Sequence, residues 1–393
     1  MVKTGLYVLV GIVLLAGMCS AQERSLIIRV TNPSDVPRES ATISVPWDSI
    51  TAILTGIRPE FLDVKESGKD AGLRYQLFSK SPGNASDCLI FQSDFKPHET
   101  KTFTISPTNN QPQSFASLVD ARYVEPREDL AWENDRIAFR MYGPALAAEV
   151  KNGIDVWTKR VRYLIVKKWY QGEEQTPKIV YHEDHGEGAD FFSVGKSLGC
   201  GGSGIWFRGA LYQPGVFSSY KILSTGPIRT CFELQYDKWD VNGKKFAETV
   251  RITLDAGQNL NHIEVAFTPT DIPELSSIVC GLVKRPNTQW FRDEQYHWMS
   301  LWGLTTDSLV NGYLGTGVVI SPEQISGWNA DTAQYLAYGQ LGEQKQFSYY
   351  AGAGWTRSDD FKSVDDWNDY LGRFAKNLQH PLQITLLRGD KSK

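Results

Sequence analysis

The chain has 393 residues, of which 41% are hydrophobic and 12% aromatic, enough for one large β domain or two medium ones with a proper core. Its formal net charge is −4, and no stripe or run of lysine and arginine occurs along it. This balance argues against a nucleic-acid partner, although a few focused basic side chains could still bind an anionic substrate.

The first residues have the pattern of a secretory leader. A basic start is followed by an apolar stretch over residues 6–18, and a small-residue cleavage site ends at Ala21. The stretch is too short to span a bilayer, and Met18 is unsuited to the position before a lipidated Cys19. We therefore predict a signal peptide over residues 1–21 and an exported protein, periplasmic or extracellular, with no membrane span and with lipoprotein anchoring disfavoured.

Export implies an oxidising compartment, in which cysteines can pair. Four cysteines follow the leader, and three pairings or buried free thiols are all compatible with the sequence: Cys88, Cys200, Cys231 and Cys280. Because their spacing is wide and no Cys-x-x-Cys pair occurs, zinc or redox chemistry at these cysteines is disfavoured.

Short stretches with β character follow one another up to residue 105 and resemble a small β-sandwich of the kind that flanks secreted sugar-active enzymes. The expected strands cover residues 25–32, 41–45, 87–92 and 100–105. A polar, proline-containing segment comes next. We predict an N-terminal β-sandwich region over residues 22–105 and a linker over residues 106–118.

The remainder, residues 119–393, keeps the β pattern with longer strands, one of them expected at residues 161–166. Asn242-Gly243 between two alternating stretches is a strong hairpin signal. One helix is expected at residues 363–379, with Ser363 as its cap and an apolar stripe along it. The predicted fold class is therefore all-β, with large stacked antiparallel sheets, a small N-terminal β-sandwich and one C-terminal helix.

The densest group of titratable side chains lies at residues 182–190, directly before a run of glycines. Two of the six histidines, His182 and His185, stand there with Asp184 and Glu187. Glycine permits positive φ and close backbone approach, so the segment predicts a shaped functional loop, although an acidic surface turn would look similar. The sequence requires no cofactor. If a divalent metal binds, then His182, His185 and Asp184 are its candidate ligands, without the spacing of a zinc protease.

Four segments resemble the domain-of-unknown-function family 4861, found in secreted proteins of saccharide-scavenging bacteria: YGPAL (142–146), GIDVW (153–157), HEDHGEG (182–188) and LDAGQNLN (254–261). Residues 226–267 also resemble strands of the galactose-mutarotase-like β-supersandwich. The resemblance implies a supersandwich fold and carbohydrate chemistry, often beside uronate-processing enzymes. At least one relative is understood as an oligosaccharide dehydratase, which removes water from a terminal uronic acid.

Elimination of water beside a carboxylate needs a group that neutralises the carboxylate, a base for the α proton and an acid for the leaving hydroxyl. We expect His185 as the base, with His182 as its partner, Glu187 to orient an imidazole and Tyr142 as the acid. The candidate substrate-binding residues are Arg140, Arg208, Trp157, Trp206 and His297. Each tryptophan could instead be a core residue.

His262 and Glu264 form a second candidate constellation. They alternate along a predicted strand and therefore share one of its faces. A histidine and a glutamate on the concave face are a usual catalytic arrangement in the supersandwich that the chain resembles. A pair on an ordinary strand surface would give the same pattern.

These observations predict an exported carbohydrate-active enzyme, a dehydratase acting on the terminal uronic acid of oligosaccharides. A polysaccharide lyase, a glycoside hydrolase and a sugar epimerase are alternatives on the same scaffold, since one fold hosts many chemistries. A hydrolase would need two carboxylates flanking the bond. A non-catalytic carbohydrate-binding protein is the alternative of another class, and it would present a flat aromatic platform instead of converging titratable groups.

Overall fold

The computed structural model describes residues 25–80, 86–108, 114–271, 276–306, 308–342 and 346–389. The predicted leader, residues 1–21, and the middle of the predicted linker, residues 109–113, lie outside these ranges. The exported location therefore stays a prediction. None of the helices within the described ranges has the length and apolar character that a membrane span requires.

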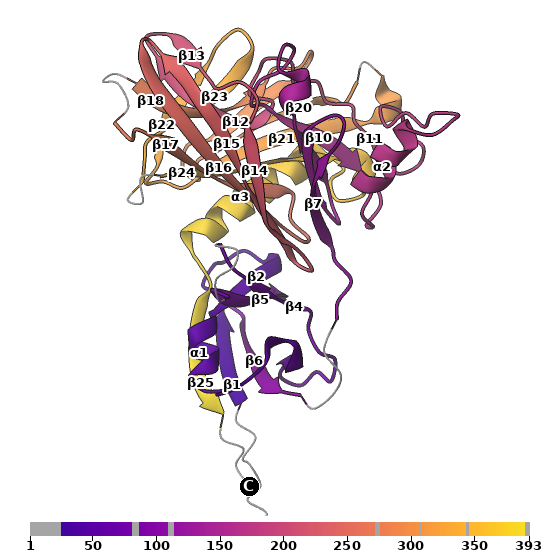
Figure 1. The fold of residues 1–393 in the computed structure, drawn as a ribbon. Coiled ribbons are helices and arrows are strands. Elements are labelled where there is room, and N and C mark those ends of the chain that lie inside the picture. Colours follow the sequence, from indigo (N-terminus) through magenta and orange to yellow (C-terminus); the bar gives the residue numbers. More distant parts are fainter. Residues whose placement is uncertain are drawn as a thin grey trace, which may run out of the picture.

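The N-terminal sandwich consists of two small antiparallel sheets (Figure 1). One sheet has the order β25 (Gln383–Gly389), β1 (Ser25–Thr31), β6 (Thr100–Pro107) and β3 (Leu62–Glu66). The other has the order β2 (Arg38–Pro46), β5 (Cys88–Phe95) and β4 (Tyr75–Phe78), with the short helix α1 (Trp47–Thr51) after β2. Alternate side chains such as Leu26, Ile28 and Val30 point inward and build its core.

The last strand returns to this sandwich. β25 pairs with β1 along its whole length, from Gly389 opposite Ser25 to Gln383 opposite Thr31. The predicted division assigned all of residues 119–393 to the large domain, and β25 departs from it because pairing with β1 satisfies backbone groups that an unpaired edge would leave open. The rest of the predicted domain division stays a prediction.

The large unit contains an antiparallel sheet of eight strands. Their order is β14 (Ser219–Thr225), β15 (Arg229–Val241), β16 (Lys244–Asp255), β17 (Leu260–Thr268), β24 (Gln346–Trp355), β21 (Tyr313–Ile320), β20 (Trp298–Leu304) and β19 (Gln289–Asp293). The predicted hairpin joins β15 to β16, where Asn242 and Gly243 have φ of +52° and +91°. Positive φ at both positions suits a tight two-residue turn.

Two five-stranded sheets complete the large unit. The first has the order β11 (Gly188–Ala189), β10 (Ile154–Lys159), β9 (Ala138–Met141), β8 (Asp129–Asn134) and β7 (Val119–Val124). The second has the order β13 (Ala210–Tyr212), β12 (Cys200–Phe207), β18 (Ser276–Val283), β23 (Gln334–Gly339) and β22 (Ile325–Ala330). Side chains of all three sheets form one core, in which Ile252 on β16 and Ile263 on β17 are fully buried. The predicted all-β sandwich class is confirmed.

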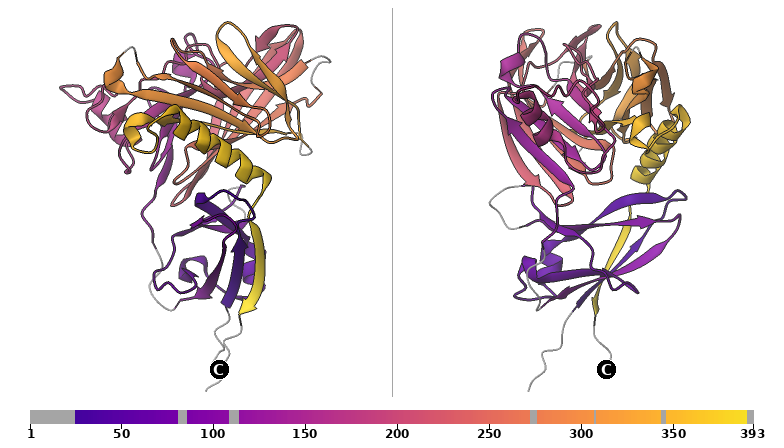
Figure 2. Two further views of the ribbon diagram at one scale, coloured as in Figure 1. Left: turned by 180° about the vertical axis from the view of Figure 1, so that it is seen from behind. Right: turned by 90° about the vertical axis from the view of Figure 1, so that its right-hand side faces the viewer.

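The C-terminal helix α3 (Val364–Gln379) connects the large unit to the sandwich (Figure 2). Ser363 caps it as predicted: its side chain accepts a hydrogen bond from the Asp366 amide, and the Asp366 carboxylate accepts one from the Ser363 amide. Trp367 and Leu371 pack on the outer face of β20 and β21. Gly315 makes this possible, because a Cβ there would lie 2.6 Å from the Trp367 ring.

A third helix, α2 (Val166–Glu173), begins at the last residue of the stretch predicted as a strand, and residues 161–165 before it form a loop in place of that strand. The amides of Ile165 and Val166 donate to the carboxylate of Glu133 on β8, at 2.8 and 2.7 Å. This cap comes from a distant strand, so the local sequence carries no sign of it. All four cysteines after the leader are free thiols, and those at 200, 231 and 280 are buried.

Candidate functional site

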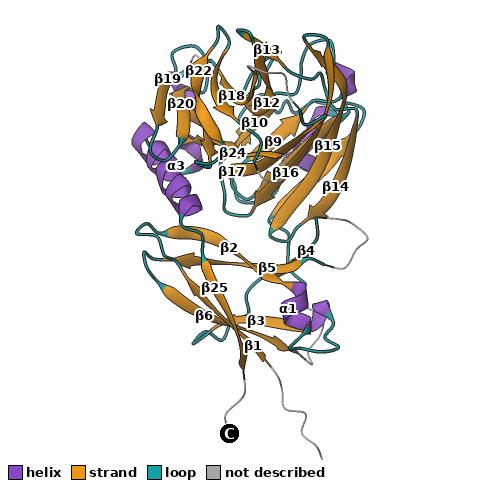
Figure 3. Ribbon diagram, turned by 90° about the vertical axis from the view of Figure 1, so that its left-hand side faces the viewer, coloured by secondary structure: helices purple, strands orange, loops and turns teal. Residues whose placement is uncertain are grey.

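A cavity of about 550 Å³ lies between the N-terminal sandwich, the outer face of the eight-stranded sheet and α3. Figure 3 shows the sheet of β2, β5 and β4 as the part of the sandwich that faces the large unit, with α3 above β2. The volume suits a small ligand, and the lining combines aromatic rings with converging charged groups. We refer to this space as the interdomain cavity.

Strand alternation explains why the sheet presents polar groups to the interdomain cavity. On β17, Ile263 and Val265 face the core, so His262 and Glu264 face the other way. On the neighbouring β16, Thr253 and Asp255 likewise face outward. If the N-terminal sandwich and α3 did not cover it, the outer face of the eight-stranded sheet would be exposed to solvent. Here this face forms one wall of the interdomain cavity.

His262 is held by two neighbours on β24. Its imidazole stacks on the Tyr350 ring, with centroids 4.6 Å apart, and its Nε2 lies 2.7 Å from Ser348 Oγ. Burial lowers the pKa of His262 to about 4, and the positive charges of Lys80 and Arg229 act in the same direction, against the opposing charge of Glu264. The ring is therefore neutral at pH 7 and able to take a proton.

Glu264 lies on the same face, with 9% of its side chain exposed. Its Oε1 is 3.4 Å from Nζ of Lys80, which follows β4 of the sandwich, and its Oε2 is 3.6 Å from Nη1 of Arg251. Burial raises the pKa of Tyr350 to about 12, so its phenol stays protonated and can donate. A neutral base and a phenolic donor thus lie side by side next to a carboxylate.

Arg229 and Asp255 form a fixed ion pair in the wall. Two guanidinium nitrogens donate to the two carboxylate oxygens at 2.6 and 2.7 Å, and the Thr42 hydroxyl of β2 donates to Asp255 at 2.7 Å. Burial acts to raise the pKa of Asp255, but the charge of Arg229 and these hydrogen bonds lower it overall. The pair therefore anchors the sandwich to the sheet.

An aromatic wall comes from α3. Phe374 meets the Tyr350 ring edge-on at 4.9 Å, and Tyr370 lies one turn away with its hydroxyl accepting from the Asn259 amide at 3.1 Å. Arg373 and Leu378 line the interdomain cavity from the same helix. Flat rings beside polar groups are the surface on which a sugar ring can stack.

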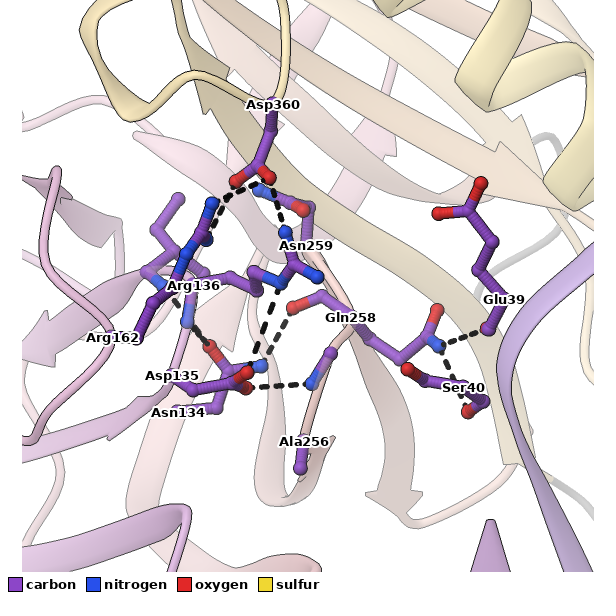
Figure 4. A network of polar contacts seen from close by, with 12 residues as sticks. Glu39, Ser40, Asn134, Asp135, Arg136, Arg162, Ala256, Gln258, Asn259 and Asp360 are labelled. Atoms are coloured by element: carbon purple, nitrogen blue, oxygen red, sulfur yellow. Dashed lines mark hydrogen bonds and ion pairs between the residues drawn. The ribbon is translucent and has the colours of Figure 1, made fainter. Parts of the chain in front are cut away.

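The turn between β16 and β17 is tied to both units (Figure 4). Gln258 donates to the carbonyl oxygens of Glu39 and Ser40 on β2, at 3.1 and 3.2 Å. Asn134 donates to the carbonyl oxygen of Gln258 at 2.6 Å. Gly257 has φ of +75°, and a Cβ there would lie 2.4 Å from Ser40 Oγ, so glycine is needed where the sandwich meets the turn. One side of the interdomain cavity is thereby held in place.

The same network continues toward α3. The Gly257 amide donates to Asp135 at 2.7 Å, and Arg136 pairs with Asp360 just before the helix (Figure 4). Arg162 also pairs with Asp360, at 2.8 Å. Sheet, sandwich and helix therefore share one polar network.

The loop at residues 182–190 lies away from the interdomain cavity. His185 is exposed, and its Nε2 lies 3.2 Å from the Val180 carbonyl oxygen. Asp184 accepts from the amides of Gly186 and Gly188, and Glu187 accepts from Lys168 at 2.5 Å and from the Trp169 indole at 3.1 Å. Both carboxylates stabilise the loop itself, so the predicted base, His185, pairs with no carboxylate among the described residues and does not line the interdomain cavity.

The three candidate metal ligands, His182, His185 and Asp184, do not form a metal site in this structure. Across the described ranges, no three histidine, cysteine, aspartate or glutamate side chains converge as metal ligands. His182 Nδ1 instead lies 3.0 Å from the carbonyl oxygen and 3.4 Å from the carboxylate of Asp190, while the carboxylate of Asp184 lies 3.3 Å from Arg160. These residues therefore do not fit a metal ion in this arrangement.

Arg140 lies at the centre of a buried network, with 4% of its surface exposed. Its Nη2 lies 2.6 Å from Asp155 and 2.8 Å from Asp190, and donates to the Tyr142 hydroxyl at 2.9 Å. Burial, reinforced by the charge of Asp155, raises the pKa of Asp190 well above its usual range. Burial likewise raises the pKa of Tyr142. The predicted carboxylate-binding residue, Arg140, and the predicted acid, Tyr142, are thus internal, and the buried carboxylates of Asp129, Asp155 and Asp190 already surround the guanidinium.

A family model described as Domain of unknown function (DUF4861) matches residues 30–384. The chain belongs to this family. Among curated proteins, uncharacterized protein P7 of Formosa agariphila is 31% identical over 403 residues, covering 97% of this chain and 98% of that protein.

A solved structure of a protein in the glycosyl hydrolase family 38 from Enterococcus faecalis is similar with a TM-score of 0.50 and 10% identity. The match covers 93% of this chain, which spans 48% of that chain's length. At this identity the likeness shows the fold alone.

The other predicted binding residues of this DUF4861 member are scattered. Trp157 is fully buried and donates to Asp155, and Trp206 is half-buried beside Tyr338. Arg208 and His297 stand in the turns after β12 and before β20, with φ of +49° and +57°. None of the four lines the interdomain cavity.

Two groups of interdomain-cavity residues escaped the sequence reasoning. Asp255 lies within the DUF4861 segment LDAGQNLN, so the family resemblance could have drawn attention to it. Lys80 and Arg373 stand in ordinary surface patterns, and nothing in their local sequence indicates that two distant segments meet around His262.

Proposed function

We propose that this protein is a carbohydrate-active enzyme that binds an acidic oligosaccharide in the interdomain cavity and eliminates water from its terminal uronic acid. The observation that carries the proposal is the environment of His262, a half-buried and neutral imidazole stacked on Tyr350 in a cavity that is also lined by cations. DUF4861 membership and the fold shared with a glycosyl hydrolase family 38 protein support carbohydrate chemistry.

The residues supply each part of the elimination. A cation neutralises the uronate carboxylate, which makes the proton on C5 acidic, and His262 takes that proton. The hydroxyl on C4 leaves as water with a proton from the Tyr350 phenol, and the electron pair of the broken C–H bond becomes the C4–C5 double bond. His262 and Tyr350 then return to their starting states by proton exchange with solvent.

The carboxylates of the interdomain cavity favour elimination over hydrolysis. A glycosidase needs two carboxyl groups flanking the bond, one of them as a nucleophile or base. Three carboxylates line the interdomain cavity, and two nitrogens of the Arg229 guanidinium engage Asp255 while Glu39 is exposed on β2. Glu264 is therefore the buried carboxylate beside His262 that has no bidentate partner. The concave shape and the converging titratable groups also favour an enzyme over a flat carbohydrate-binding module.

The test uses a panel of saturated, uronic-acid-terminated oligosaccharides, each paired with its carboxyl-reduced analogue. We expect ultraviolet absorbance of a conjugated enol-ether carboxylate to grow with the acid alone, together with the loss of one water by mass and no shortening of the chain. Absorbance with shortening would indicate a lyase, and shortening without absorbance a hydrolase. Intact sugars that bind without reacting would indicate a binding module. Each of these three results contradicts the proposal. A parallel run with chelator asks whether a metal contributes.

A further inference from the structure

Four cations line the interdomain cavity, and two of them already have fixed partners. Arg229 donates to both oxygens of Asp255. Arg38 donates to the Asn32 side chain at 2.8 Å and to the carbonyl oxygens of Asn377 and His380 at the end of α3. Both guanidinium groups therefore serve the structure of the walls.

The other two cations are available. Lys80 contacts Glu264 at 3.4 Å, longer than a good charged hydrogen bond, and its side chain is 52% exposed. Arg373 lies on the exposed side of α3, and within the described part of the chain it has no ion pair or side-chain hydrogen bond. One of these cations comes from the sandwich and the other from the helix.

We infer that Lys80 and Arg373 together bind the carboxylate of the acidic saccharide, so that the N-terminal sandwich is part of the binding site and not an accessory module. This inference rests on the proposed function, since it names the groups that neutralise the uronate. Arg373 offers the planar fork that matches a carboxylate, and Lys80 adds a mobile point charge beside Glu264 and His262. The carboxylate would replace the loose contact between Lys80 and Glu264.

The acidic ligand should therefore bridge the two units. A charged hydrogen bond in a partly enclosed site contributes enough to change an affinity by about tenfold. Removal of either cation should weaken binding of the acid by about that factor. It should leave a neutral analogue unaffected, because the neutral sugar has no group for the cation to meet.

The experiment is a binding titration by calorimetry, with a uronic-acid-terminated oligosaccharide and its carboxyl-reduced analogue as the two ligands. The full chain is compared with Lys80→Met, Lys80→Arg and Arg373→Met. Lys65→Met serves as the matched control, because Lys65 pairs with Asp63 in the sandwich at 2.7 Å but does not line the interdomain cavity. Thermal unfolding of each variant confirms that it is folded.

We expect Lys80→Met and Arg373→Met to weaken binding of the acid about tenfold each, with Lys80→Arg and Lys65→Met close to the parent protein and the neutral ligand unchanged throughout. The inference would be overturned if the methionine variants bound both ligands equally more weakly, or if they bound the acid as tightly as the parent protein does. It would also be overturned if the parent protein did not bind the acid. Charge-dependent binding without turnover would refute the proposed elimination alone. Turnover that both methionine variants retain in full would refute this inference alone.

Discussion

The imidazole of His262 stacks on the phenol ring of Tyr350, with the centroids 4.6 Å apart and the planes inclined by 20°. The two residues are cross-strand partners of β17 and β24, so the register of the sheet fixes their contact. Burial shifts their pKa values apart, to about 4 for His262 and about 12 for Tyr350. Two titratable groups separated in this way are suited to act as base and acid at neutral pH.

The pH dependence of turnover follows from the lowered pKa of His262. The neutral imidazole is the active form, so activity should be constant near neutrality and fall only as the pH drops through about 4. The measurement is kcat/KM against pH, which reports the free enzyme. An acid limb near 6.5, the ordinary value for histidine, would contradict the environment described for His262.

The Arg140 network should act on stability and not on substrate binding. Arg140→Met leaves Asp155 and Asp190 buried without their counter-charge, which should lower the free energy of unfolding by about 3–5 kcal/mol. Urea denaturation measures the change. Arg208→Met is the control, because Arg208 is exposed at a turn, and it should stay within about 0.5 kcal/mol of the parent protein. A small effect of Arg140→Met would show that the network does not depend on the charge of Arg140.

The buried carboxyl group of Glu248 makes the free energy of unfolding depend on pH. Glu248 lies in the core with its Oε1 accepting from Ser203 at 2.5 Å, and burial raises its pKa to about 7. Between pH values of about 4.5 and 7 the folded state keeps this proton while the unfolded state releases it, so stability should fall as the pH rises.

The contribution of Glu248 should be on the order of 3 kcal/mol across that window. Glu248→Gln removes the titration and keeps an oxygen for Ser203, so its unfolding free energy should depend less on pH than that of the parent protein. Urea denaturation at about pH 5 and pH 8 measures the difference. Parallel pH profiles for the two proteins would rule out this role for Glu248.

Local patterns predicted the elements whose causes are local. Ser363 caps α3 through contacts within four residues, and Asn242-Gly243 forms its turn because both residues accept positive φ. By contrast, α2 begins where the sequence indicates a strand, because its cap is Glu133 from a distant strand. Secondary structure that depends on a tertiary partner has no local signal.

The candidate site also has one part that the local sequence predicts and one part that depends on tertiary contacts. Strand alternation alone places His262 and Glu264 on one face. The wall opposite them depends on the docking of the sandwich through Thr42 and Gln258, which no periodicity encodes. The many charged residues at 182–190 predicted a functional loop. The sequence alone could not show that the carboxylates of Asp184 and Glu187 stabilise this loop, or that Arg140 is buried beneath it.

The most direct test of the central claim compares turnover of the parent protein, His262→Asn and His182→Asn on a uronic-acid-terminated oligosaccharide. His262 lines the interdomain cavity, whereas His182 is exposed beside the Arg140 network, so the pair separates the two candidate sites. We predict that His262→Asn lowers the rate by at least about 10²-fold while His182→Asn stays within about twofold of the parent. Loss of activity in His182→Asn with activity retained in His262→Asn would contradict the account and place the chemistry at the loop of residues 182–190.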